Sequence, residues 1–308
     1  MERKAKAASV SVASNTFLLI IKASVGLITG SVSVLSAAAD SVNDLVASLI
    51  ALYSVRVSGK PADTEHPYGH GKIENVSGAV QAILIFTAAI YIIREAVNKI
   101  LNPKPLETLG LGMIVMGITC VLDLFVSRYL LHVARETDSA AIKADAYHLT
   151  TDVWTSLGVL FALVLVQVTK IQIIDPIFAL VVAALILRVA YSLTAEALHM
   201  LLDTRLPDEE VTQLQKMVIN TPKVVGYHKL RTRKAGSSRE IDYHLIVPAG
   251  MPVLEAHRIA QAIEDKMQNL FPDTNIVTHI EPDTVDIISE PGTKLRKGQS
   301  VRKPRRRA

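Results

Sequence analysis

The apolar residues of this 308-residue chain gather in long blocks over about the first two thirds of its length, and the remaining third has ordinary mixed polarity. Each block is close to the ~20 residues that a helix needs to cross ~30 Å of hydrocarbon. The pattern therefore predicts a transmembrane domain over 1–206, with six helices at about 8–30, 33–57, 76–101, 109–132, 146–169 and 173–200.

After Leu206 the periodicity changes to that of a small soluble domain. A helix that opens with proline and acidic residues is expected first, then two alternating strands, a second amphipathic helix and a third strand. These elements are predicted at 207–220, 223–233, 239–247, 252–270 and 275–281. The order α-β-β-α-β predicts a two-layer α+β domain over 207–286. Residues 287–308 are predicted to be a basic, disordered tail.

Charge and cysteine content narrow the class of protein further. The net charge of +4 lies mainly in the stretch Lys294–Arg307. Beside a membrane domain, such a tail favours anionic lipid over nucleic acid, and a merely solvated tail is the simplest interpretation. The single cysteine, Cys120, lies in an apolar block, which excludes an intrachain disulfide and a Cys-rich zinc module.

The distribution of lysine and arginine predicts the orientation of the chain. Three basic residues lie in each of the N-terminus, the second connection and the fourth connection, against about four on the opposite side. By the positive-inside rule, both termini are expected in the cytoplasm. The N-terminal run has no small-residue cleavage site, so we expect it to remain as the first helix.

Two predicted membrane helices carry paired ionisable residues. Asp40 and Asp44 lie on the second helix, and His148 and Asp152 on the fifth. Each pair is spaced i, i+4, so its members share one helix face, and together they offer four ligands of the kind that suit tetrahedral Zn²⁺. Burying such groups costs at least ~2.5 kcal/mol each, which favours a translocation pathway over structural polar packing.

Two further charged residues lie inside predicted membrane helices. Asp123 can relay protons or contact a metal ligand, and it can equally make a local polar contact with Ser127 one turn on or lie near the cytoplasmic end of its helix. Lys22 is interpreted as structural.

Histidines outside the membrane helices form two more groups. Asp63, His66 and His70 are spaced for an oxygen/nitrogen metal site, although an ordinary loop has the same appearance. The soluble domain carries four histidines and an acidic residue that can build a dinuclear site within one subunit or between subunits: His228, His244, His257, His279 and Glu281. Glu281 follows His279 by two positions, so both side chains point to one strand face.

Together these residues resemble the cation diffusion facilitator family, which comprises six-helix zinc, ferrous-iron and cadmium exporters with a cytoplasmic metallochaperone-like (ferredoxin-like) domain. The resemblance runs over roughly 8–285. The motifs that carry it are Lys22…Gly26…Gly30-Ser31, Ala39-Asp40-Ser41…Asp44, His66-Pro-Tyr-Gly-His70-Gly-Lys72, His148…Asp152 and Leu201-Leu202-Asp203…Leu206-Pro207. The absence of a histidine run in 133–145 favours a bacterial-type member in the cytoplasmic (inner) membrane.

The resemblance implies a role for each group of residues. The transport site is expected to be Asp40, Asp44, His148 and Asp152, with a loop site at Asp63, His66 and His70 and a binuclear cytoplasmic site at His228, His244, His257, His279 and Glu281. Lys72 and Asp203 match a charge interlock across a homodimer. Glu281 departs from the aspartate expected of zinc and iron exporters, and its extra methylene re-aims the carboxylate.

The predicted function is export of Zn²⁺ by proton antiport through alternating access, with Cd²⁺, Fe²⁺ and Co²⁺ as further candidate ions. Zn²⁺ is then both substrate and regulatory ligand at the soluble domain. The alternatives are a membrane metal sensor or scaffold that does not transport, and the same transporter with Fe²⁺ or Mn²⁺ as its main substrate. An intramembrane metalloenzyme is disfavoured, because four protein ligands leave no open position for water and no HExxH motif is present.

Overall fold

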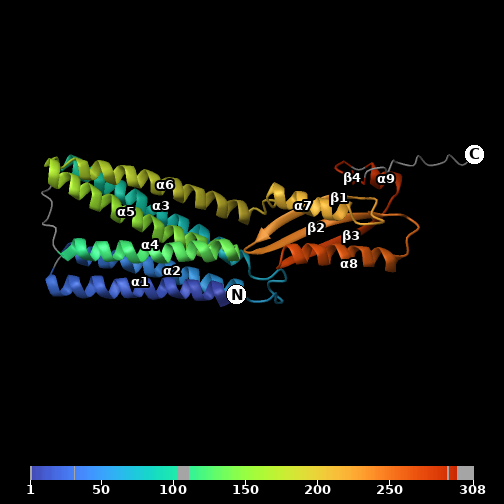
Figure 1. Cartoon of the computed structure of the whole chain (residues 1–308), viewed down its shortest axis with the longest axis horizontal. Coiled ribbons are helices and arrows are strands. Elements are labelled where there is room, and N and C mark those ends of the chain that lie inside the picture. The colour runs from blue at the N-terminus through green and yellow to red at the C-terminus, as the bar shows by residue number, and fades with distance from the viewer. Residues whose placement is uncertain (1, 31, 103–110, 290, 297–308) are drawn as a thin grey trace, which may run out of the picture. The chain divides into compact units, whose positions relative to one another are not determined.

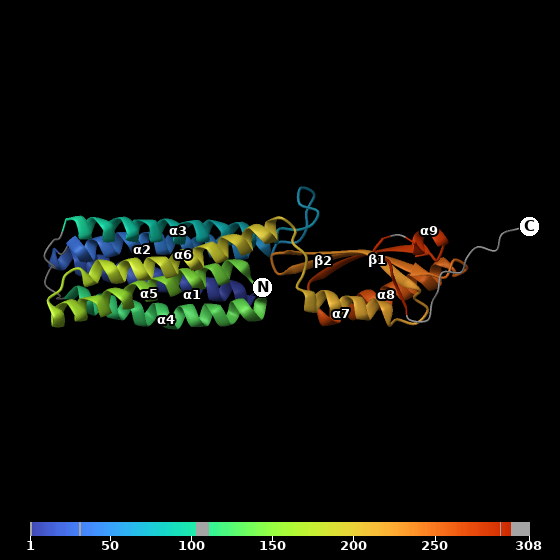
Figure 2. The ribbon, with the colours of Figure 1, turned by 90° about the horizontal axis from the view of Figure 1, so that it is seen from above.

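A computed structural model describes residues 2–30, 32–102, 111–289 and 291–296. The chain divides into two units between Leu201 and Leu202, and each is described by itself below. The first unit is a bundle of six long helices, and the second is a small domain with a mixed β-sheet (Figures 1 and 2).

All six predicted membrane helices are present, and each is long and apolar enough to cross a membrane. They are α1 (Glu2–Thr29), α2 (Val32–Ser58), α3 (Lys72–Leu101), α4 (Leu111–Thr137), α5 (Ala140–Thr169) and α6 (Ile174–Leu201). Among the helices of the bundle, the most extensive packing is between α3 and α6, α1 and α2, and α4 and α5. We call the end of the bundle at which α1, α3 and α5 begin the near end, and the other the far end (Figures 1 and 2).

At the near end the helices continue beyond the apolar stretches that the sequence analysis used. Helix α3 begins four residues earlier than predicted, at Lys72, and α5 six residues earlier, at Ala140. The added turn of α3 contains Glu74, which is buried and accepts hydrogen bonds from side chains of three other segments: Lys4 Nζ at 3.0 Å, Ser58 Oγ at 2.9 Å and the hydroxyl of Ser139. A polar helix turn is stable here because its charged group is fully paired.

The described residues of the second unit form seven elements in chain order. They are α7 (Asp208–Ile219), β1 (Gly226–Ala235), β2 (Ser238–Val247), α8 (Val253–Leu270), β3 (Thr274–Pro282), α9 (Val285–Ile288) and β4 (Lys294–Leu295). The sheet order is β3-β2-β1-β4, with β2 and β3 parallel and the other pairs antiparallel. Alternate residues of β2, among them Ile241, Tyr243 and Leu245, pack against α7 and α8 to form the core.

Strand β4 was not predicted from the sequence. It pairs with β1 at Gly226 and Tyr227. Glycine is needed at position 226, because a Cβ there would lie 2.4 Å from the carbonyl oxygen of Lys294 in β4. Part of the segment assigned to the disordered tail is therefore folded, namely the end of α9 and β4. The strongly basic residues 297–308 lie outside the described residues.

The β1–β2 hairpin contains one irregularity. Its pairing runs regularly from the turn to Arg231 opposite Asp242, and the next pair is His228 opposite His244. Strand β1 thus carries one extra residue in this interval, and Lys229 there has a positive φ of 51°. This is a β-bulge, which changes the face to which the following side chains point.

Candidate metal centres

A cavity of about 710 Å³ lies inside the helix bundle and is lined by residues from all six helices. Its lining includes the predicted ligands Asp40, Asp44, His148 and Asp152. It also includes Lys22 and Asp123, so both charged residues singled out in the other helices face the same space.

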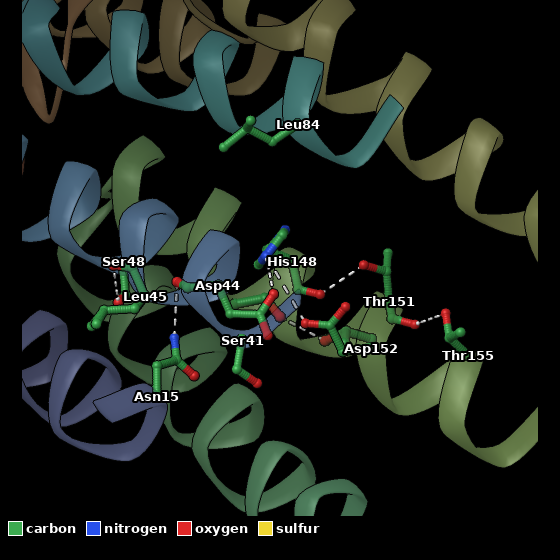
Figure 3. A network of polar contacts seen from close by, with 12 residues as sticks. Asn15, Ser41, Asp44, Leu45, Ser48, Leu84, His148, Thr151, Asp152 and Thr155 are labelled. Carbon is green, nitrogen blue, oxygen red and sulfur yellow. Dashed lines mark hydrogen bonds and ion pairs between the residues drawn. The ribbon is translucent and has the colours of Figure 1, made fainter. Parts of the chain in front are cut away.

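Three of the four predicted ligands converge in this cavity (Figure 3). His148 Nε2 of α5 lies 3.3 Å from Asp44 Oδ1 of α2 and 4.0 Å from Asp152 Oδ2, one turn further along α5. Zinc ligands sit ~2.0–2.2 Å from the ion, so two ligands at tetrahedral positions are about 3.3–3.6 Å apart. These two distances between ligand atoms are therefore close to those of a zinc site. The i, i+4 spacing of His148 and Asp152 places both side chains on one face of α5, as the sequence analysis expected.

Asp40 lies apart from this group. It precedes Asp44 by one turn on α2 and lines the same cavity. Among the described residues, however, the compact group whose ligand atoms lie within 4.8 Å of one another consists of Asp44, His148 and Asp152. Its part in binding an ion stays a prediction.

Contacts to the backbone hold the ligand helices in place. Asn15 Nδ2 of α1 donates to the carbonyl oxygen of Asp44 at 3.1 Å, and Thr151 Oγ1 donates to the carbonyl oxygen of His148 at 2.7 Å (Figure 3). Lys22 Nζ donates to Ser41 Oγ at 2.6 Å, which brings a cation beside the helix that carries Asp40 and Asp44. Lys22 is thus part of the cavity wall as well as a link between α1 and α2.

Asp123 is buried, with 3% of its surface exposed. The hydroxyl of Ser127, which a local contact with Asp123 would use, donates instead to the carbonyl oxygen of Leu124 at 3.2 Å. The role of Asp123 as a proton relay stays a prediction.

Sequence reasoning missed one further acidic residue of α5. Asp145 lies one helical turn before His148 and is completely buried. Its i, i+3 spacing from His148 was a signal that could have identified it.

The loop between α2 and α3 brings its three predicted ligands together. His66 Nδ1 lies 3.3 Å from Asp63 Oδ1, and His70 Nε2 lies 3.4 Å from Asp63 Oδ2. The backbone N–H groups of His66 and Glu65 donate to Asp63 at 2.6 and 3.0 Å, and these bonds, with that from His66 the stronger cause, lower the pKa of Asp63. The carboxylate is therefore ionised at neutral pH, as a metal ligand must be.

In the second unit, three histidines form a row across the sheet. His228 of β1 is paired with His244 of β2, which is paired with His279 of β3. Glu281 lies two residues beyond His279, and its carboxylate oxygens are 2.6 Å from His228 Nε2, 2.8 Å from His244 Nδ1 and 3.4 Å from His279 Nε2. The row lies on the sheet face opposite Tyr243 and Leu245, and therefore opposite the helices.

Glu281 is the centre of this cluster. Burial by itself raises the pKa of Glu281, but hydrogen bonds from His228 and His244 outweigh it and hold the pKa below its ordinary value of 4.5. His257 lies on α8, in the helical layer, and is exposed. Within the described part of the chain, the compact group contains His228, His244 and Glu281, so the contribution of His257 stays a prediction.

The proposed interlock residues belong to different units. Lys72 begins α3, whereas Asp203 follows α6 and accepts a hydrogen bond from Arg233 Nη1 at 3.0 Å within the second unit. The pairing of Lys72 with Asp203 stays a prediction.

Comparison with known proteins gives matches over both units. The family described as "Cation efflux transmembrane domain" matches residues 8–202, and that described as "Cation efflux protein, cytoplasmic domain" matches residues 206–283. A protein of Yersinia enterocolitica named cation-efflux pump FieF is 38% identical over 282 residues, which cover 92% of this chain and 93% of that protein. A Klebsiella pneumoniae protein of the same name is 36% identical over 280 residues, covering 91% and 93%. A solved structure of CzrB in its Zn form is 33% identical and covers 26% of this chain and 92% of its own, with a TM-score of 0.25.

Proposed function

Since this chain belongs to the cation efflux family and is a multi-pass membrane transporter, we propose that it exports Zn²⁺ from the cytoplasm in exchange for protons. The observation that carries the proposal is the convergence of Asp44, His148 and Asp152 in one cavity inside the helix bundle. Asp40, which lines the same cavity, is proposed as the fourth ligand.

Exchange follows from the chemistry of these ligands. Metal requires a neutral imidazole and ionised carboxylates, so metal loading releases protons and proton binding expels metal. Alternating access of one cavity to the two sides of the membrane then couples the two flows in opposite directions. The histidine favours Zn²⁺ over harder ions such as Mn²⁺, while Cd²⁺, Fe²⁺ and Co²⁺ can use the same ligands.

The second unit supports a regulatory role for the same ion. We infer that Zn²⁺ bound by the row of histidines and Glu281 favours a homodimer and so shifts the conformational equilibrium of the transporter. The proposed location is the bacterial inner membrane, with both termini in the cytoplasm and the C-terminal tail close to anionic lipid.

Flux of metal into liposomes containing the full-length protein tests the proposal. We expect Zn²⁺ flux that rises with an opposing proton gradient and is accompanied by proton counterflow, with Cd²⁺ and Fe²⁺ as competitors. Flux that does not depend on the pH gradient would refute the exchange step. Tight Zn²⁺ binding without flux would instead support a sensor or scaffold.

A further inference from the structure

The cavity that holds Asp44, His148 and Asp152 lies in the middle part of the helix bundle. Along α5 its lining begins at His148 and runs to Ser156, and along α3 it begins at Leu84 and runs to Ile92. Both helices run from the near end to the far end (Figure 1). The first turns of α3 and α5, at the near end, therefore do not line the cavity.

The part of the bundle between the cavity and the near end contains a set of buried polar side chains, which we call the near-end polar set: Ser11 of α1, Asn75 and Gln81 of α3, and Asp145 of α5. Within the described residues, hydrogen-bond partners are absent for Ser11 Oγ, both amide atoms of Asn75, Gln81 Oε1 and both carboxylate oxygens of Asp145. Gln81 Nε2 donates to the carbonyl oxygen of Ala141 at 3.4 Å, one turn before Asp145. The side chain of Ser11 on α1 lies beside the Asp145 carboxylate, although the two groups do not have the geometry of a hydrogen bond.

This arrangement is unfavourable for a purely structural role. A buried polar atom without a partner destabilises the folded state, and an ionised carboxylate does so most. Neighbours of Asp145 on α5, including Ile142, Ala146 and Leu149, belong to a packed apolar cluster. An apolar side chain would fit this environment better than a carboxylate. A bound cation would supply the partner that this carboxylate lacks, so the function of Asp145 is expected in a cation-bound state.

We propose that Asp145 is a loading residue, which binds the arriving divalent cation together with the Ser11 hydroxyl and passes it to His148. The inference rests on the proposed function, in which the near end faces the cytoplasm. Asp145 and His148 are spaced i, i+3, so their side chains are neighbours on one helix face. A carboxylate and a hydroxyl are hard oxygen ligands that hold Zn²⁺ weakly, whereas the next site adds an imidazole. The cation thus moves from a weak position to a stronger one.

The test compares full-length wild type, D145N and D138N in liposomes, with ZnCl₂ offered on the side of the near end. Asp138 is an exposed carboxylate at the same end, so D138N is a matched control for the loss of one charge. For D145N we expect kcat/KM for Zn²⁺ flux to fall at least ~tenfold, while the equilibrium Kd of the transport cavity stays within about threefold of wild type. D138N should keep the wild-type kcat/KM.

Thermal unfolding separates this role from a structural one. D145N should unfold at or above the wild-type temperature, because an unpartnered buried carboxylate is removed. A D145N protein that transports Zn²⁺ at the wild-type rate overturns the inference. A protein that unfolds well below wild type, or whose Kd weakens as much as its kcat/KM, overturns it as well and makes Asp145 a structural support of His148. A wild type that carries no Zn²⁺ refutes the proposed function and this inference together.

Discussion

Replacing Asp44 with alanine is the most direct perturbation of the proposed transport site. Its carboxylate lies 3.3 Å from His148 Nε2 and is 23% exposed at the side chain. Removing one charged partner of a buried ion pair costs about 2–5 kcal/mol; for the pair of the Asp44 carboxylate and a bound Zn²⁺, the partial exposure of Asp44 places the expected loss at the lower end, about 2–3 kcal/mol. Since 1.4 kcal/mol is a factor of ten, Zn²⁺ affinity should fall by about 30- to 150-fold.

The other two histidine clusters also bind Zn²⁺ under the proposed function, so the measurement needs a suitable background. Titration calorimetry on the full-length protein carrying H70A and H244A isolates the cavity inside the helix bundle. Asn43 precedes Asp44 on α2 and lines the same cavity, which makes N43A a matched control. A Kd for D44A within threefold of the background protein, or equal losses for D44A and N43A, would refute the assignment of Asp44 as a ligand.

Three further predictions concern other parts of the molecule. H148D should shift the ratio of Zn²⁺ to Cd²⁺ flux toward Cd²⁺, because a carboxylate replaces the imidazole; an unchanged ratio counts against His148 as a ligand. Glu281 has a lowered pKa, so its stabilising contribution is present above pH 4.5 and lost as pH falls through the lower folded value. Calorimetry on the metal-free full-length protein should therefore show E281Q less stable than wild type at pH 6, with a difference that closes below pH 4.5; a constant difference would contradict this. G158A places a Cβ 2.5 Å from Val182 Cγ2 and should destabilise the α5–α6 packing by about 1–3 kcal/mol, with V182A restoring the unfolding temperature; no rescue would refute the clash.

Sequence patterns identified the helix bundle because hydrocarbon imposes a minimum length on each apolar block. They did not identify where the helices end, since a helix continues into water wherever its polar groups are paired. Glu74 illustrates the difference, because its partners Lys4, Ser58 and Ser139 come from three distant segments. No local pattern contains that information.

The candidate sites likewise combine local features, which sequence patterns predicted, with contacts between distant segments, which they did not predict. The i, i+4 spacing predicted that His148 and Asp152 share a helix face, but only packing brings Asp44 of α2 to them while leaving Asp40 outside the compact group. Histidines in the soluble domain were recognisable one by one, whereas their alignment in a row depends on the pairing of three strands. The position of His257 on the helical layer follows from that topology.

The bulge in β1 has a consequence for reading related sequences. Counted back from the hairpin turn without the extra residue, His228 would lie opposite Leu245 and point into the core, and Lys229 would lie opposite His244. A homologue that lacked one residue between positions 228 and 231 would need no bulge, because its histidine would then occupy the regular position opposite His244. The histidine of β1 can therefore be matched between related sequences only when the length of this interval and the presence of the bulge are considered together.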